Sequence, residues 1–269
     1  MSRRRIKGLR TILTGASMGI GRALAEELAR GGARLVLGAR SREALESLAA
    51  ELRGRGAEAV DVPCDVTVAA DRQGLLDAAR KHFGGLDLLI NNAGVGALGP
   101  FAQATEDRLR RIFEVNFFGL TELVRLCLPA LAEGDAPMIV NVSSILGKRG
   151  FPLSSEYCAS KFAVQGFSEA LRAELMRTGI DVLVVCPGAT ETPFLQNVID
   201  KQGERPWPDR GKMSAETVAR KTVAAIRRGK HEIILTAPAR FLHCMNRFVP
   251  CLVDRFLARY GPPAESDDR

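Results

Sequence analysis

Short aliphatic segments alternate with longer amphipathic segments along most of the chain. The short segments are rich in Val, Ile and Leu and are bounded by glycine and polar residues, which predicts β-strands. The longer segments repeat apolar residues every three or four positions, which predicts α-helices. The expected strands are Leu9–Thr14, Arg34–Ala39, Ala59–Cys64, Leu86–Ile90, Met138–Val142, Asp181–Cys186 and Glu232–Leu235. The expected helices are Ile20–Arg30, Arg42–Arg53, Ala69–Phe83, Thr105–Ala132, Ser155–Arg177 and Ala215–Arg227.

The alternation of strand and helix predicts parallel strands that are joined by right-handed crossovers. Segments such as Arg34–Ala39 and Asp181–Cys186 are apolar without interruption, as is typical of strands that helices cover on both faces. No linker rich in Gly, Ser and Pro divides the chain, and no internal repeat is found. We therefore expect one α/β domain over residues 1–238, with a doubly wound, seven-stranded parallel sheet flanked by helices.

Residues 188–213 fit this alternation poorly, because they carry Pro193, Pro206, Pro208 and the chain's single tryptophan, Trp207. Long irregular connections inside a compact domain are uncommon and usually functional. The segment is therefore predicted to be a lid over the binding site.

The C-terminal part of the chain is predicted to be an amphipathic helical extension over residues 239–260, which Pro250 splits in two. Apolar side chains recur there at helical spacing, and arginines lie mostly elsewhere around the helix. Such a segment can pack on a neighbouring subunit, roof the active site or lie on a membrane surface. The sequence favours packing or a subunit contact and leaves a peripheral membrane contact open. Residues 261–269 are expected to be a disordered tail.

Composition limits the class of protein. The chain has 269 residues, of which 46% are hydrophobic and 26% charged, as in ordinary globular proteins, so general disorder is excluded. No uninterrupted run of 18 apolar residues occurs, so we expect no spanning helix. The basic start of the chain is followed by a segment that Lys7 and Arg10 interrupt, so no export signal is expected.

Charge and cysteine content narrow the partners. The net charge is +7, but the basic residues are scattered without a stripe of interleaved aromatics. We therefore expect no nucleic-acid partner and favour anionic small molecules. The six cysteines and three histidines show no metal-ligand spacing, so neither a metal site nor a disulfide framework is expected. These features are typical of a cytoplasmic protein with reduced thiols.

The first predicted strand leads into a glycine-rich turn and then a helix. Three glycines let the backbone turn sharply and approach a pyrophosphate, and the helix start favours an anion. The spacing is G-x3-G-x-G, and a structural turn in a nucleotide-free protein is the alternative. The strand before the turn and the helix after it favour a dinucleotide. The candidate binding residues here are Gly15, Ser17, Met18, Gly19, Ile20 and Gly21.

The second predicted strand ends at Arg40, and no acidic residue follows until Glu43. A carboxylate at this position would repel a 2′-phosphate, whereas a guanidinium can bind it through two hydrogen bonds. The sequence therefore favours NADP(H), with NAD(H) as the alternative, and a solvated Arg40 would carry no preference.

Further motifs follow the glycine-rich turn in order. They are Cys64-Asp65-Val66, Asn91-Asn92-Ala93-Gly94, Val115-Asn116, Ser143-Ser144, Tyr157-Cys158-Ala159-Ser160-Lys161, and Cys186-Pro187-Gly188 followed by Thr192. Over about residues 9–235 this ordered set resembles the single-domain short-chain dehydrogenase/reductase family, which has a Rossmann fold.

The resemblance implies further roles in cofactor binding. It places Asp65 against the adenine, and it implies that Asn91 steadies the central strand and the cofactor. The nicotinamide end would be held by Pro187, Gly188 and Thr192. The remaining expected cofactor contacts are Val66, Asn92, Ala93, Gly94, Tyr157, Lys161 and Thr190. Met18 departs from many NADP-preferring members, which carry Lys or Arg there, so a second phosphate partner is missing.

The catalytic set is predicted to comprise Asn116, Ser144, Tyr157 and Lys161. Hydride transfer to a carbonyl requires a proton donor on its oxygen. Tyr157 and Lys161 lie four residues apart and so share a helix face, where the lysine charge would favour the phenolate. Ser144 lies 13 residues before Tyr157, the usual family separation, and would polarise or position the substrate oxygen, with Ser143 as the alternative.

Asn116 has two readings. It can form a packing hydrogen bond inside the helix, or it can anchor a water that relays protons to Lys161, and the resemblance favours the water. The long helices around Asn116 and Tyr157 also form subunit contacts in the family, which implies a homodimer or a homotetramer.

The sequence thus predicts an NADP(H)-dependent oxidoreductase that interconverts a carbonyl and a secondary alcohol. The candidate pocket residues are mainly apolar, which suits a lipid-like or steroid-like substrate. A 3-oxoacyl-thioester reductase that docks an acidic carrier protein, with Arg110 and Arg111 as the docking pair, is the main alternative. A non-catalytic NADP-sensing scaffold is a third reading, although it would not need the four catalytic residues together.

Overall fold

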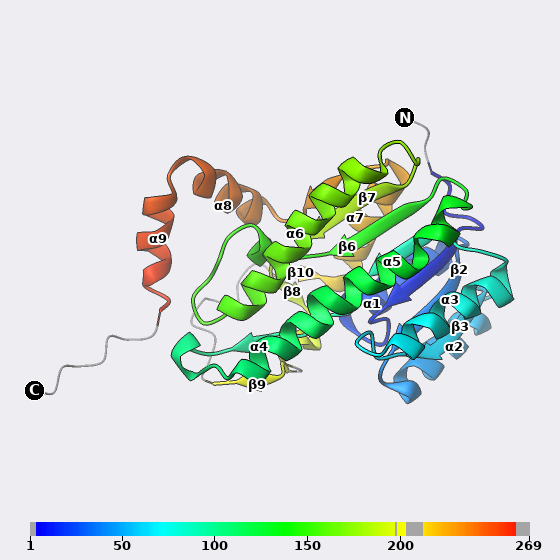
Figure 1. Ribbon diagram of the computed structural model, residues 1–269, viewed down its shortest axis with the longest axis horizontal. Coiled ribbons are helices and arrows are strands. Elements are labelled where there is room, and N and C mark those ends of the chain that lie inside the picture. The colour runs from blue at the N-terminus through cyan, green and yellow to red at the C-terminus, as the bar shows by residue number, and fades with distance from the viewer. Residues whose placement is uncertain (1–3, 197, 203–211, 262–269) are drawn as a thin grey trace, which may run out of the picture.

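The computed structural model describes residues 4–196, 198–202 and 212–261. Its centre is a seven-stranded sheet in the order β11-β7-β6-β4-β1-β2-β3, in which every neighbouring pair is parallel (Figure 1). The strands are β1 (Arg10–Thr14), β2 (Arg34–Ala39), β3 (Ala59–Pro63), β4 (Leu88–Asn91), β6 (Met138–Val142), β7 (Asp181–Cys186) and β11 (Glu232–Ile234). The predicted doubly wound parallel sheet is confirmed, with strand ends shifted by one or two residues.

Helices cover both faces of the sheet (Figure 1). They are α1 (Gly19–Arg30), α2 (Arg42–Gly54), α3 (Ala69–Phe83), α4 (Glu106–Phe113), α5 (Gly119–Ala132), α6 (Ser155–Leu175) and α7 (Ala215–Arg227). Buried residues of α1, α2 and α7 share one core cluster with the sheet, and those of α3, α5 and α6 share the other. Leu35 and Leu37 of β2 point into the first cluster, whereas Val36 points into the second. Both faces of a strand are therefore buried, which explains the uninterrupted apolar runs.

The single helix predicted over Thr105–Ala132 is interrupted. Between α4 and α5 lies a π-helical turn, η2 (Glu114–Phe118), after which the Gly119 N–H binds the Glu114 carbonyl five residues back. A π turn adds one residue to a helix and shifts the period of its apolar positions. The apolar residues on both sides of Asn116, Val115 and Phe117, hide this shift in the sequence.

Residues 188–213 are more regular than expected. β8 (Thr190–Glu191) pairs with β10 (Met213–Ser214), and β9 (Asp200–Lys201) pairs with β5 (Ala97–Leu98). A short 3-10 helix, η4 (Pro193–Gln196), lies between β8 and β9. Pro206, Trp207 and Pro208 of the predicted lid lie outside the described residues.

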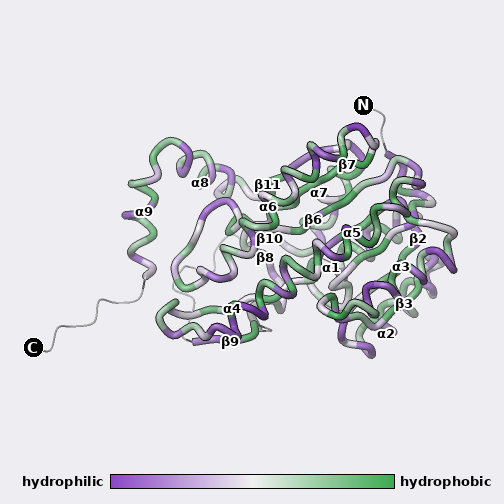
Figure 2. Tube along the Cα trace, in the orientation of Figure 1, coloured by the Kyte–Doolittle hydropathy of each residue, from purple (hydrophilic) through white to green (hydrophobic). Residues whose placement is uncertain are grey.

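The C-terminal extension forms two helices, α8 (Ala237–Phe248) and α9 (Pro250–Ala258), so Pro250 begins the second helix. They project from one end of the sheet, and each carries both hydrophobic and hydrophilic residues (Figures 1 and 2). Arg149 ties them to the body through a 2.8 Å hydrogen bond to Asn246 and an ion pair with Asp254. Apart from Gly261, the tail predicted at 261–269 lies outside the described residues.

By length and mean hydropathy alone, one stretch of the described residues, Glu106–Ala132, is long and apolar enough to cross a membrane. This stretch comprises α4, η2 and α5. Its buried residues Leu123, Val124 and Leu131 belong to a core cluster against the sheet. A core helix satisfies the same test of length and composition, and packing against the sheet accounts for the buried apolar residues of this stretch.

Candidate active site

The glycine-rich turn connects β1 to α1 and has no space for a side chain at Gly15 or Gly21. Gly15 and Gly19 adopt φ angles of +65° and +53°, a region that favours glycine. A Cβ on Gly15 would lie 2.9 Å from Ala93 Cα, and one on Gly21 would lie 1.9 Å from the Gly15 carbonyl oxygen. The N-cap residue of α1 is Met18, whose side chain makes no capping hydrogen bond. The turn therefore fits the pyrophosphate of a dinucleotide, which can cap such a helix.

Asn92 supports this turn from behind. Its side-chain amide donates to the carbonyl oxygens of Thr14 and Gly15, both at 3.0 Å, and its backbone N–H donates to Thr14 Oγ1 at 3.1 Å. Around the turn itself, Ser17 and Ile20 are half-buried and Met18 is exposed. Asn92 thus fixes the shape of the turn that would hold the cofactor.

The adenosine end of the candidate site lies along the ends of β2 and β3. Arg40 is exposed directly after β2, and Glu43 is exposed on α2. The Asp65 carboxylate accepts hydrogen bonds from the Thr67 N–H at 2.9 Å and the Thr67 hydroxyl at 2.8 Å. Asp65 therefore closes a local turn before the buried Val66, and its contact with an adenine ring stays a prediction.

Tyr157 and Lys161 occupy the first two turns of α6. Burial raises the pKa of Tyr157 above its usual value, and a hydrogen bond with Ser144 only partly offsets this. Burial also lowers the pKa of Lys161 to about 8. The Lys161 ammonium donates to the Val142 carbonyl at 3.0 Å and lies 5.8 Å from the Tyr157 ring centre. Desolvation is the largest cause of the raised Tyr157 pKa, and the lowering expected from the Lys161 charge stays a prediction.

The two neighbouring serines point to different partners. The Ser143 hydroxyl is buried and donates to the Lys161 backbone carbonyl at 3.2 Å. Ser144 accepts the Leu146 N–H at 3.1 Å as it caps the short 3-10 helix η3 (Ile145–Gly147), and it contacts Tyr157. The structure therefore brings Ser144, rather than Ser143, to the tyrosine.

Asn116 lies fully buried in the π-helical turn η2. Its side chain accepts the Val95 N–H at 2.8 Å, donates to the Val95 carbonyl at 2.9 Å and donates to Ser160 Oγ at 3.0 Å. All three contacts are with protein groups, as the packing alternative requires. The water relay to Lys161 stays a prediction.

The segment after β7 lies beside the glycine-rich turn. The Pro187 carbonyl accepts the Ile145 N–H at 2.9 Å, and the Thr190 hydroxyl donates to the Gly188 carbonyl at 3.1 Å. A Cβ on Gly19 would lie 3.1 Å from Thr192 Cγ2. Residues 187–192 are thus placed where they could hold the nicotinamide end of a cofactor whose pyrophosphate lies on the turn.

Gly94 and Phe194 border the catalytic helix. A Cβ on Gly94 would lie 3.2 Å from Asn116 Oδ1 and 3.5 Å from Lys161 Nζ, so a side chain there would press on both catalytic candidates. The Phe194 ring lies 5.7 Å from the Tyr157 ring, centre to centre. Phe194 lies in the segment expected to be the lid, and its contact places an apolar ring beside Tyr157.

One polar cluster near the site was not predicted from the sequence. Arg108 of α4 is only 3% exposed and forms ion pairs with Glu156, which is 2% exposed, and with Asp200. The signal available in the sequence was the position of Arg108 four residues before the apolar Ile112, on the inward side of the helix. A charged residue is ordinarily assigned to the solvent, so the pattern alone gave no partner.

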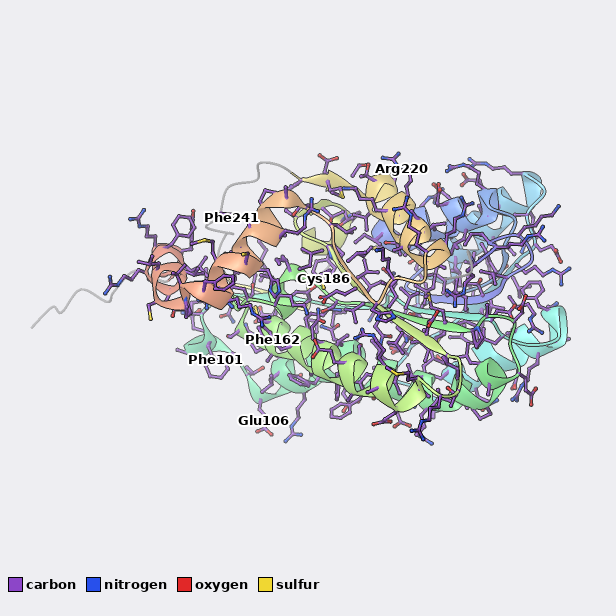
Figure 3. All side chains as sticks on the ribbon, turned by 90° about the horizontal axis from the view of Figure 1, so that it is seen from above. Phe101, Glu106, Phe162, Cys186, Arg220 and Phe241 are labelled. Atoms are coloured by element: carbon purple, nitrogen blue, oxygen red, sulfur yellow. The ribbon has the colours of Figure 1, made fainter. Side chains whose placement is uncertain are left out.

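Thiols and metal ligands add no second centre within the described ranges. Among those residues no group of three or more His, Cys, Asp and Glu could hold a metal ion. Cys64, Cys127, Cys158 and Cys186 are buried, and burial raises the pKa of each thiol. Cys186 lies in the interior at the end of β7 (Figure 3), where the Gln165 amide donates to its sulfur at 2.9 Å.

Parallel sheets bind dinucleotides at the carboxyl ends of their strands, and this edge carries both the glycine-rich turn and Ser144, next to the Tyr157–Lys161 pair. Fold and site together define a nicotinamide-dependent oxidoreductase. Residues 10–203 match the family model described as short chain dehydrogenase. The chain belongs to the short-chain dehydrogenase/reductase family.

Named relatives and solved structures agree with this assignment. The ketoacyl reductase HetN of Nostoc sp. is 31% identical over 262 residues, which cover 95% of this chain and 90% of that protein. A short-chain dehydrogenase/reductase of Burkholderia phymatum, solved in complex with NAD, superposes with a TM-score of 0.85 at 30% identity over 93% of this chain and 96% of its own. An alcohol dehydrogenase of Thermococcus sibiricus, complexed with 5-hydroxy-NADP, superposes with a TM-score of 0.75 at 26% identity. The match covers 84% of this chain and 94% of that one.

Proposed function

We propose that this oxidoreductase interconverts a carbonyl and a secondary alcohol with NADP(H), and that its substrate is hydrophobic, of lipid-like or steroid-like character. The observation that carries the proposal is the contact of Ser144 with Tyr157, one helical turn from Lys161 and beside the segment 187–192. This arrangement provides a proton donor and a hydrogen-bond donor for one oxygen atom, as carbonyl reduction requires.

In this proposal Tyr157 is the acid and Ser144 positions the substrate. When bound, the nicotinamide supplies or accepts the hydride. The raised pKa keeps the Tyr157 phenol protonated at neutral pH, so it can donate its proton to the carbonyl oxygen in the direction of reduction. Ser144 accepts the Leu146 N–H, and its own O–H, which bonds to Tyr157 in this structure, would turn to the substrate oxygen when a carbonyl binds. Lys161 holds positive charge near the phenol and would stabilise the phenolate that remains.

Apolar side chains around Tyr157 support a hydrophobic substrate. Phe194 packs on its ring, and Leu146, Phe151 and Leu153 are half-buried on the segment between Ser144 and α6. An apolar wall with a few convergent polar groups is typical of pockets for hydrophobic small molecules.

A panel of carbonyls and alcohols tests the function, with NADPH consumption or formation as the measurement. The proposal expects the highest kcat/KM on a bulky apolar ketone or its alcohol. A clear preference for a β-ketoacyl thioester would instead support the carrier-protein alternative, and the absence of turnover despite tight NADPH binding would support the sensing scaffold.

The alternative, a 3-oxoacyl-thioester reductase, is supported by the name of the Nostoc relative. Its docking pair is less suited than the sequence suggested. Arg110 and Arg111 are exposed on α4, but Arg110 forms a 2.6 Å ion pair with Glu106 on the same helix. The intramolecular partner compensates part of the charge that an acidic carrier protein would need.

Cofactor choice gives a prediction at Arg40, since relatives bind NAD in one case and an NADP derivative in another. Arg40→Asp should lower kcat/KM with NADPH by about 10-fold to 100-fold and leave NADH less affected, because a charge-assisted phosphate contact is replaced by repulsion. The measurement is the ratio of the two efficiencies.

Arg42→Asp is the matched control for this prediction. Arg42 is exposed two residues further along and lies 3.8 Å from Glu46, so it reports the effect of charge alone. An unchanged NADPH/NADH ratio in the Arg40 variant, or an equal change in both variants, would remove the role given to Arg40.

We further propose that the chain forms a homodimer or a homotetramer through α6 and through the long helix made of α4, the π turn η2 and α5. Phe118 and Phe162 on these helices are 47% and 45% exposed, as large apolar side chains at a subunit contact would be in one isolated chain. Light scattering coupled to size-exclusion chromatography measures the assembly, and a monomer at micromolar concentration would contradict it.

The C-terminal helices α8 and α9 carry exposed apolar side chains that could contact a further partner. Phe241, Phe248, Leu252 and Phe256 are 68%, 74%, 57% and 51% exposed, and Figure 3 shows Phe241 on α8 at the projecting end of the molecule. Exposed arginines accompany them at 240, 247, 255 and 259. We propose that this aromatic and basic face rests on an anionic lipid surface, as a peripheral contact of a cytoplasmic protein. A second copy fits less well, because it would bring the same arginines together.

The Phe241→Ser/Phe248→Ser double variant should bind anionic vesicles at least about fivefold less than the wild type, since two aromatic side chains that would enter the lipid surface are lost. Flotation with phosphatidylcholine vesicles containing phosphatidylglycerol measures the bound fraction. The control is Met176→Ser, which removes a 74% exposed apolar side chain from the far end of α6. No flotation of the wild type would refute the membrane contact, and dimerisation through this face would reassign it.

A further inference from the structure

Three side chains from separate parts of the chain meet beside the catalytic helix. We call Arg108, Glu156 and Asp200 the Arg108 cluster. Arg108 of α4 donates through Nε and Nη2 to Glu156 Oε1, at 2.8 Å and 2.6 Å, and through Nη1 to Asp200 Oδ2 at 2.7 Å. Glu156 lies in the first turn of α6, and Asp200 lies in β9. One guanidinium thus connects three elements.

Both carboxylates lie on segments that carry or contact Tyr157. Glu156 precedes Tyr157 in α6. The strand of Asp200 follows η4, whose Phe194 ring packs against the Tyr157 ring at 5.7 Å. β9 itself is held on the body by the bonds from the Ile199 N–H to the Gly96 carbonyl and from the Gln202 N–H to the Leu98 carbonyl.

Burial restricts the positions that the side chains of this cluster can take. The Arg108 and Glu156 side chains are 3% and 2% exposed, whereas Asp200 is 34% exposed. A buried guanidinium must keep its partners, because an unpaired charge in the interior is costly. Its planar fork also fixes the directions of the two carboxylates, which a lysine ammonium cannot do.

We propose that Arg108 is a positioning residue that sets β9 and Phe194 against Tyr157, and thereby determines how tightly the substrate is held over the catalytic tyrosine. The proposal rests on the proposed function, since it assumes that the substrate lies between Phe194 and Tyr157. Arg108 itself donates to the two carboxylates and acts through the elements that carry them.

Asp200→Asn tests this with the smallest change, because it keeps the shape of the side chain and leaves the buried Arg108–Glu156 pair in place. The KM for the best carbonyl of the panel should rise about tenfold, since a charge-assisted bond becomes a neutral one. The cofactor Kd should change less than about twofold, because the glycine-rich turn is untouched. Amide hydrogen exchange at Ile199 and Gln202 should be at least about fivefold faster, since β9 opens more often.

Two further variants separate positioning from a general structural effect. Asp200→Glu keeps the charge and should restore KM and exchange to within about threefold of the wild type. Glu106→Gln breaks the exposed 2.6 Å pair with Arg110 on the same helix and should change neither quantity.

The proposal is overturned if Asp200→Asn leaves both KM and exchange at the level of Glu106→Gln, or if Asp200→Glu fails to rescue. Should the Asn variant not fold, Arg108→Lys provides the same comparison, because a single ammonium cannot bind both carboxylates in the observed directions. A wild type without turnover would instead contradict the proposed function. Faster exchange in the Asn variant would then still support the positioning of β9.

Discussion

Tyr157→Phe is expected to lower kcat by about 10³-fold while the cofactor Kd stays within about twofold of the wild type, since a positioned general acid contributes about 10²-fold to 10⁴-fold. Phenylalanine keeps the ring that packs 5.7 Å from Phe194 and removes only the hydroxyl beside Ser144. The loss therefore falls on proton transfer, with packing preserved. Steady-state turnover and fluorescence titration with NADPH measure the two quantities.

The chain offers a matched control in Tyr260→Phe. Tyr260 is the only other tyrosine of the sequence, and its ring packs at 5.7 Å from Phe256 in the C-terminal extension. This variant should keep full turnover. If Tyr157→Phe retained more than about a tenth of the wild-type kcat, the acid would have to be another group.

Gly21→Ala carries the second large effect. A Cβ at this position would lie 1.9 Å from the Gly15 carbonyl oxygen and 2.6 Å from the Asn92 amide nitrogen, so the turn and its support must both move. Overpacking of this kind lowers the free energy of unfolding by about 3 kcal/mol. Because the turn would no longer fit a pyrophosphate, affinity for NADPH should fall at least about 100-fold.

Gly74→Ala is the matched substitution in another helix. The added Cβ in α3 would have Val62 Cγ1 at 3.9 Å, an ordinary contact, so alanine should stabilise the helix by about 0.5–1 kcal/mol. Urea unfolding and NADPH titration compare the two variants. Wild-type affinity in a folded Gly21→Ala protein would show that this turn does not hold the pyrophosphate.

The sheet could be predicted from the sequence because strands such as β2 and β7, buried on both faces, read as uninterrupted apolar runs. The glycine-rich turn could be predicted because no other residue fits where backbones approach closely. The π turn was not predicted, because the residues on both sides of Asn116 are apolar and the extra residue leaves no polar gap in the sequence. The segment 105–132 was therefore predicted as one continuous α-helix.

The sequence could predict which residues belong to the site, but it could not predict most of the contacts that these residues make. The four-residue spacing of Tyr157 and Lys161 places them on one helix face, but the direction of the Lys161 ammonium toward Val142 depends on the packed interior. Ser143 and Ser144 are neighbours in sequence, and only the backbone after β6 decides which one faces the tyrosine. Arg108 depends on partners 48 and 92 residues away, which no local pattern contains.

The π-helical turn also lets α4 and α5 adopt different rotations about the axis of the long helix. α5 is oriented by Leu123 and Val124, which pack against the sheet, whereas α4 is oriented by Arg108 toward Glu156. Each residue of an α-helix advances the rotation by about 100°. Deleting one residue within Glu114–Phe118 would restore continuous α-helical bonding and rotate α4 by that angle relative to α5. Single-residue length changes should therefore be excluded from this helix during the divergence of related chains, while surface loops accept them.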